Sequence, residues 1–241
     1  MAAELSRVRA PLTIAAAQPP CLPKDVWANA LAHASTIRDA RARVVVFPEL
    51  SLTGYELDAD VVGPDDEALT PIVESCTEMQ SIALVGAPVA GDGEKIHIGM
   101  LQVSSTGVDV AYRKSYLGGD EAKRFSPGEG AAAIDVDGWR IGLGICKETG
   151  VAQHISETAA LDVDLYAAGL VHLPEELAMQ DERGVRIAHA CGAYVAFASF
   201  AGATGSPFDR TAGASTIWAP DSTPMARAGA EPGAIARASL T

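Results

Sequence analysis

Residues 132–146 read AAIDVDGWRIGLGIC, two apolar runs joined by the dipeptide Asp137-Gly138. An Asp-Gly pair between two such runs is typical of a tight hairpin turn, so the stretch predicts two antiparallel strands. A second hairpin is expected over residues 96–114, turned around residues 105–107. Since helical segments alternate with strand-like runs in the rest of the chain, the hairpins add antiparallel pairs to an α/β pattern. We therefore predict an α/β fold with two sheets sandwiched between helix layers.

The segments outside the two hairpins follow one another as strand and helix. Apolar residues at helical spacing predict helices over 24–42, 67–80 and 174–192, with a short helix near 150–160. Strands are expected over 12–18, 43–48, 81–89, 163–169, 194–200, 213–220 and 233–240. No Pro/Ser-rich linker and no repeat interrupts the sequence, so residues 1–241 are predicted to form a single domain. The alanine-rich tail over 226–241 is expected to be partly mobile.

The composition indicates which kinds of binding partner and which cellular compartment to expect for the protein. Hydrophobic residues make up 48% of the 241 and charged residues 20%, which excludes wholesale disorder. With 18 basic against 31 acidic residues, the formal charge of -13 argues against nucleic acid or a membrane surface as a partner. The apolar run LTIAAA (12–17) is too short for a signal-peptide core, and no run approaches the ~20 residues that span a bilayer. A soluble, cytoplasmic protein is expected.

Cysteines and histidines give no sign of a metal site. The cysteines are irregularly spaced, without a CxxC pair, so neither a zinc site nor a disulfide framework is expected: Cys21, Cys76, Cys146 and Cys191. The histidines also lack the spacing of metal ligands and are interpreted as structural or surface residues: His33, His97, His154, His172 and His189.

Three reactive side chains stand directly after predicted strands, where α/β folds collect their functional groups. Glu49 follows the run VVVFP, Lys114 ends DVAYRK and Cys146 ends RIGLGIC. A carboxylate can accept the thiol proton of a cysteine and pass it to a leaving amine, while a lysine can favour the thiolate and stabilise an oxyanion. These residue types suffice for acyl transfer from an amide without a metal or cofactor. Taken singly, each is more often a helix cap, a surface charge or a buried apolar thiol.

Three segments that contain these residues resemble, in order, the signatures of the nitrilase superfamily of carbon–nitrogen hydrolases: FPELSLTGYE (47–56), YRKSYLGGDEAKRFSPGEG (112–130) and GLGICKETG (142–150). TIAAAQPP (13–20) is similar to the first strand of that family, and GASTIWAPDS (213–222) to its late Gly-x-Ser strand. The resemblance implies a four-layer αββα sandwich of two mixed sheets between helix layers, associated into homodimers or larger homo-oligomers. It implies no cofactor.

The same resemblance implies roles for individual residues. Glu49 corresponds to the general base, Lys114 to the group that stabilises the oxyanion, and Cys146 to the nucleophile. Glu121, in DEAKRFSPG (120–128), matches a second glutamate that orients the lysine and contacts substrate in the family. Tyr55, in TGYE (53–56), is expected to line the pocket.

The sequence departs from the family pattern beside the nucleophile. Lys147 and Glu148 stand where the family usually has an aromatic residue and an aspartate, and Tyr116 stands where it usually has a histidine. The segment AAGLVHLPEEL (167–177) lacks the Asn-Trp pair common in the family. We hypothesise that the Lys147 side chain favours substrates that carry a carboxylate. The alternative is an ion pair between Lys147 and Glu148 or another acid.

The function expected from these residues is hydrolysis of a small linear amide through a thioester on Cys146. Within the family, hydrolysis of a nitrile or of an N-carbamoyl amide is an alternative. A thiol hydrolase of another class would pair Cys146 with His154 or His172 instead. A binding protein that kept the fold and lost catalysis is a further alternative.

Overall fold

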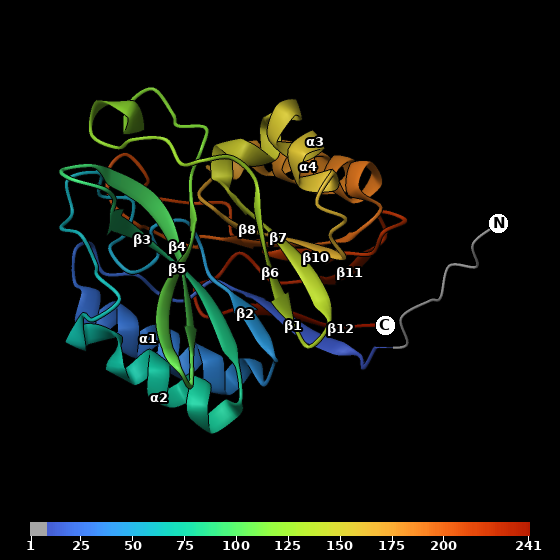
Figure 1. Cartoon of the computed structure of the whole chain (residues 1–241), viewed down its shortest axis with the longest axis horizontal. Helices are drawn as coiled ribbons and strands as arrows, with labels where there is room; N and C mark the ends of the chain where they lie inside the picture. Colours follow the sequence, from blue (N-terminus) through green and yellow to red (C-terminus); the bar gives the residue numbers. More distant parts are fainter. Residues whose placement is uncertain (1–8) are drawn as a thin grey trace.

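The apolar runs pair into two six-stranded sheets in the computed structural model, which describes residues 9–241 (Figure 1). The first sheet has the order β12-β1-β2-β3-β4-β5, with strands β1 (Leu12–Ala17), β2 (Val44–Val46), β3 (Ile82–Ala90), β4 (Ile96–Ser104), β5 (Gly107–Arg113) and β12 (Ile235–Leu240). The second has the order β11-β10-β9-β8-β7-β6, with strands β6 (Ala132–Val136), β7 (Trp139–Ile145), β8 (Leu165–Leu170), β9 (Tyr194–Ser199), β10 (Thr216–Trp218) and β11 (Pro224–Arg227). In each sheet three central strands run parallel and the remaining pairs are antiparallel.

Four helices cover the outer faces of the sheets. Helices α1 (Val26–Ala40) and α2 (Thr70–Met79) lie on the first sheet, and α3 (Ala152–Ala159) and α4 (Leu177–Cys191) lie on the second (Figure 1). One apolar cluster joins the inner faces of the two sheets, and each sheet has one further cluster between its outer face and its helices. The predicted αββα order of layers is therefore confirmed. Within the described residues, no helix combines the length and the apolar character needed to cross a membrane.

The hairpin at residues 132–146 forms as its turn chemistry predicts. Strands β6 and β7 pair from Ala132 with Leu143 to Val136 with Trp139. Asp137 has a φ of 51° and Gly138 a φ of 84°. A two-residue turn with positive φ at both positions matches the right-handed twist of the flanking strands, and Asp-Gly tolerates it well.

Two predictions need correction, one about where two helices begin and one about the mobility of the C-terminal tail. The helices predicted to begin at residues 67 and 174 each begin with a 3-10 turn, η1 (Glu67–Leu69) and η4 (Pro174–Glu176), before the α-helix starts. The prediction of a partly mobile tail was wrong. Strand β11 closes one edge of the second sheet, and β12 pairs with β1 over its full length, so backbone hydrogen bonds fix the tail.

A buried carboxylate, Glu148, joins the ends of β5 and β7. Its Oε1 accepts hydrogen bonds from the Tyr112 hydroxyl at 2.6 Å and from the Ser115 backbone N–H at 2.6 Å. Its Oε2 accepts from the Ile145 backbone N–H at 2.8 Å. Because these donors belong to two different sheets, Glu148 fixes the distance between the two strand ends.

Two glycines, one in each sheet, allow neighbouring strands to lie close to the backbone around Glu49. A Cβ on Gly169, in β8, would lie 2.7 Å from the Glu49 nitrogen and 2.6 Å from the Phe47 oxygen. A Cβ on Gly86, in β3, would lie 2.5 Å from the Pro48 oxygen. Real Cβ atoms do not approach backbone this closely, so any larger residue would displace the loop that carries Glu49.

We expect Gly169→Ala to lower the free energy of unfolding by about 1–3 kcal/mol, the usual cost of overpacking a core. The control is Gly63→Ala, because a Cβ at Gly63 would meet nothing within 4 Å. That variant should stay within about 0.5 kcal/mol of the wild type in urea denaturation. Equal stability of the two variants would contradict the close approach.

We expect Glu148→Ala to destabilise the protein by about 3 kcal/mol or more, because each buried donor left without a partner costs about 1–3 kcal/mol. The exposed Glu94 provides the matched control, and Glu94→Ala should leave the urea midpoint nearly unchanged. A wild-type midpoint for Glu148→Ala would show that its hydrogen bonds do not hold the strand ends together.

Candidate active site

The ends of β2, β5 and β7 bring three predicted side chains into one buried cluster. Lys114, directly after β5, donates from Nζ to Oε1 of Glu49 at 2.6 Å. It also donates to Oε1 of Glu121, in η2 (Glu121–Lys123), at 2.7 Å. The side chains of Lys114 and Glu49 are 0% exposed and that of Glu121 is 4% exposed. Cys146 follows β7 directly and contributes to the electrostatics of this cluster.

The Lys114 ammonium stays charged although it is fully buried. Burial alone would lower its pKa, but the negative charges around it, with Glu49 the largest contributor, outweigh burial and raise the pKa. Burial raises the pKa of Glu121, but the charge of Lys114 and its hydrogen bond outweigh burial, so the pKa is lowered. Lys114 and Glu121 therefore form a charged pair beside Glu49.

Glu49 is the carboxylate in this cluster that can take up a proton near neutral pH. Burial raises the pKa of Glu49 to about 7, with Lys114 opposing the shift and Glu121 adding to it. Its Oε2 is buried and receives no nitrogen or oxygen donor in the described part of the chain, while an interaction with the Cys146 thiol slightly lowers the pKa of this carboxylate. A buried carboxylate with a pKa near 7 and one oxygen left open is suited to accept and return a proton.

The Cys146 thiol is neutral at rest. Burial and the negative charge of Glu49 raise its pKa, while Lys114 opposes them. Sγ lies 3.4 Å from the carbonyl oxygen of Val171, to which the thiol donates. A neutral thiol needs a base to become a strong nucleophile, and Glu49 is the group positioned for that role.

The backbone at Cys146 makes a sharp turn. Cys146 has a φ of 41°, a left-handed conformation that is unusual for a residue with a Cβ. It ends the strand and begins the 3-10 turn η3 (Cys146–Gly150). The Thr149 hydroxyl donates to the Cys146 carbonyl at 2.7 Å and closes the turn. Strain of this kind persists only where the surroundings enforce it, and it directs the thiol out of the strand.

Tyr55 and Lys147 lie at the edge of the cluster and make different contacts. The Tyr55 hydroxyl donates to Glu121 Oε1 at 2.8 Å, so Tyr55 belongs to the network that holds Lys114. Lys147 is exposed, and its ammonium donates to the carbonyl of Leu117. It contacts neither the cluster nor Glu148 in the hydrogen bonds and ion pairs of the described residues. A preference of Lys147 for carboxylate-bearing substrates stays a prediction.

His172 lies in the site, although it was interpreted from the sequence as a structural or surface histidine. It is 3% exposed, and its Nε2 lies 3.9 Å from Sγ of Cys146. Its position two residues after β8, at the same end of the sheet as Cys146, was the signal that could have identified it. His154 instead contacts the Tyr112 hydroxyl at 3.0 Å and belongs to the buried cluster around Glu148.

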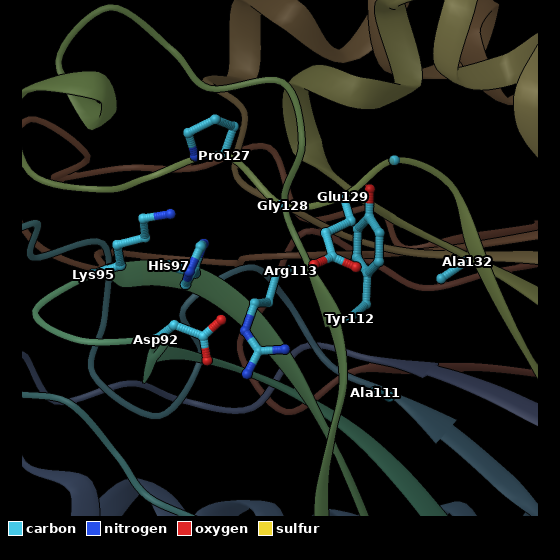
Figure 2. A pocket seen from close by; sticks show the side chains of 12 residues that line it. Asp92, Lys95, His97, Ala111, Tyr112, Arg113, Pro127, Gly128, Glu129 and Ala132 are labelled. Atoms are coloured by element: carbon cyan, nitrogen blue, oxygen red, sulfur yellow. The ribbon is translucent and has the colours of Figure 1, made fainter.

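A polar hollow of about 420 Å³ lies between the turn that joins β3 to β4, the end of β5 and residues 127–130, and Figure 2 shows the side chains that line it. Its lining includes Asp92, Lys95 and Arg113, but not Glu49, Lys114 or Cys146. Because Arg113 directly precedes Lys114 on the chain, the hollow borders the strand that carries the lysine. Because successive side chains of a strand point to opposite faces, the hollow is separate from the acid–base cluster.

Comparison with known proteins finds a sequence relative of this chain and solved structures that share its fold. A protein of Pseudomonas protegens named "Hydrolase in pqqF 5'region" is 27% identical over 227 residues, covering 90% of this chain and 79% of that protein. The amidase from Nesterenkonia sp. AN1, in a structure with acrylamide added at its active-site cysteine, superposes with a TM-score of 0.84. That match has 20% identity and covers 95% of this chain and 93% of the amidase.

A eukaryotic protein has the same fold. Nit3 of Saccharomyces cerevisiae, a member of branch 10 of the nitrilase superfamily, superposes with a TM-score of 0.84 at 21% identity, covering 95% of this chain and 90% of Nit3. The family model for carbon–nitrogen hydrolases matches residues 13–241. The chain therefore belongs to the carbon–nitrogen hydrolase family.

Proposed function

We propose that the protein hydrolyses a small linear amide, with Cys146 as nucleophile, Glu49 as general base and acid, and Lys114 as electrostatic stabiliser. The observation that carries the proposal is the buried Oε2 of Glu49, which receives no nitrogen or oxygen donor while Oε1 is held by Lys114. The neutral Cys146 thiol interacts with this carboxylate. One oxygen of the carboxylate is thus fixed by a cation and the other is available to a proton.

The first half of the proposed reaction forms a thioester. The Cys146 proton moves to Oε2 of Glu49 as sulfur attacks the amide carbon, and the carbonyl electron pair moves onto oxygen. Lys114 Nζ and the backbone N–H of Lys147, in the first turn of η3, are the donors for that oxyanion. The C–N bond then breaks, Glu49 returns the proton to nitrogen, and ammonia or an amine leaves.

The second half regenerates the enzyme. Glu49, ionised again, takes a proton from water, and the resulting hydroxide adds to the thioester carbon. Collapse of this second tetrahedral intermediate breaks the C–S bond and releases a carboxylic acid, and Glu49 returns its proton to the leaving sulfur, which restores the Cys146 thiol. General acid–base transfer of this kind contributes roughly 10²–10⁴-fold to the rate.

The relatives give chemical probes for this proposal. In structures of the Nesterenkonia amidase, acrylamide and the acetamide moiety of fluoroacetamide are covalently attached to the active-site cysteine. Both reagents are small linear amides with an electrophilic carbon. We propose that the present site admits molecules of the same class.

We expect fluoroacetamide to add one acetamide group to the wild-type protein, detected by intact mass, and to add none at this position in Cys146→Ala. The same substitution should lower ammonia release from a panel of amides by roughly 10³-fold or more. Cys191→Ala is the matched control, because Cys191 is a free, half-buried cysteine outside the cluster. Ammonia release from nitriles alone, or from carbamoyl compounds alone, would replace the amidase proposal by hydrolysis of that class of compound. If the protein turned over none of the three classes, the result would favour a binding protein.

We expect kcat/KM to fall as the pH drops below about 7, because the reaction needs Glu49 ionised and burial raises its pKa to about 7. Glu121 adds to that shift by like-charge repulsion, so Glu121→Gln should move the acid limb of the profile to lower pH. The pH dependence of ammonia release from an acetamide-like substrate measures both. An acid limb that Glu121→Gln leaves in place would contradict the assignment to Glu49.

A further inference from the structure

His172 presents one ring nitrogen to the nucleophile. Its Nε2 lies 3.9 Å from Sγ of Cys146, on the segment whose Val171 carbonyl also contacts that sulfur. The Val171 carbonyl oxygen and the His172 ring nitrogen, from consecutive residues, therefore both face the Cys146 sulfur. A buried polar group at this position needs a reason, because burial of an imidazole costs free energy unless both nitrogens are satisfied.

The tautomer of His172 follows from the orientation of Gln180, on α4. The Gln180 Nε2 donates to the carbonyls of Gly213 at 3.3 Å and Ala214 at 3.4 Å. Its Oε1 is therefore the atom that faces His172 Nδ1, at 3.1 Å. Since an amide oxygen only accepts, Nδ1 carries the proton, and the lone pair of the neutral ring is on Nε2, toward the sulfur.

A second residue of α4 supports the same arrangement. Arg183 lies three positions after Gln180, on the same face of the helix. Its Nη1, which can only donate, lies 3.4 Å from His172 Nε2, so the lone pair on that nitrogen faces both the guanidinium and the sulfur. The same Nη1 lies 3.5 Å from the Thr149 hydroxyl, which closes the turn at Cys146. Burial lowers the pKa of His172, and the adjacent guanidinium lowers it further, so the ring stays neutral. Helix α4 thus holds both the imidazole and the turn.

We propose that His172 is a positioning residue for Cys146: the Nε2 edge of its ring, held in place by Gln180 and Arg183, keeps the sulfur in the rotamer from which it attacks. This inference rests on the proposed function, in which the thiol proton goes to Glu49. A thiolate–imidazolium pair is disfavoured, because burial raises the pKa of the thiol and lowers that of the imidazole. His172 therefore acts through the position of the sulfur and takes no proton.

Two substitutions separate this role from plain packing. In His172→Gln the side-chain amide reaches the place of Nε2 and can face the sulfur. In His172→Asn the shorter amide reaches only the place of Nδ1 and keeps the contact to Gln180. Positioning through Nε2 predicts that the glutamine variant keeps kcat within about threefold of wild type, while the asparagine variant loses about tenfold, the usual weight of one neutral hydrogen bond. KM should change little in either.

The experiment compares kcat, KM and the rate of Cys146 alkylation by iodoacetamide in wild type, His172→Gln and His172→Asn, with Tm as the check on folding. If His172→Asn unfolds, His172→Met takes its place as an unbranched apolar filler. Equal or higher rates for the asparagine or methionine variant would overturn the inference.

The alkylation rate separates this inference from the proposed function, because alkylation does not need amide turnover. A glutamine variant that alkylates faster than the asparagine variant supports positioning even if no amide is hydrolysed. Loss of all turnover in both His172 variants, with activity kept in Glu49→Gln, would overturn both proposals in favour of a Cys–His pair.

Discussion

The site depends on one buried ammonium, that of Lys114, held between the carboxylates of Glu49 and Glu121. Burying a charge without a partner costs several kcal/mol, and breaking a buried ion pair by removing one partner costs about 3–5 kcal/mol. The three groups can therefore be buried only together. Since Glu49 and Lys114 follow different strands and Glu121 lies in a connecting loop, their mutual need fixes how those segments meet.

The surrounding structure meets that need by small, local means. The glycine in β8 lets the second sheet approach the backbone of Glu49, and the carboxylate of Glu148 joins the strand end that carries Lys114 to the one that carries Cys146. Neither residue touches the ion pair. Both set the position of the backbone from which the charged side chains extend, so the geometry of the site is a property of the sheet packing.

Much of this arrangement follows from the sequence because it depends on local chemistry. The turn at Asp137-Gly138 and the placement of Glu49, Lys114 and Cys146 after strands are readable from residue order alone. The pairing of β12 with β1 is not, since its partners are more than 200 residues apart and alanine-rich sequence resembles a mobile tail. The contact between His172 and Cys146 depends on the parallel register of β7 and β8, which no short motif encodes.

The direction of the Lys147 side chain could not be predicted from the sequence either. Its ammonium meets a backbone carbonyl of the loop after β5, whereas Glu148, one residue later, turns into the protein. Adjacent residues in a 3-10 turn point in different directions, so their opposite charges do not imply a pair. Such a pair is a natural expectation from composition, and the turn geometry prevents it.

The charges of the cluster explain why a neutral thiol suits the proposed reaction. With Glu49 ionised, Lys114 and Glu121 cancel and the site holds one excess negative charge. Transfer of the thiol proton to Glu49 moves that charge to sulfur, and attack on the amide moves it to the substrate oxygen, beside Lys114. The total buried charge stays the same at each step, so no step has to bring an additional charge into the low-dielectric interior. A thiolate at rest beside an ionised Glu49 would add a second negative charge, and the raised pKa of Cys146 prevents that state.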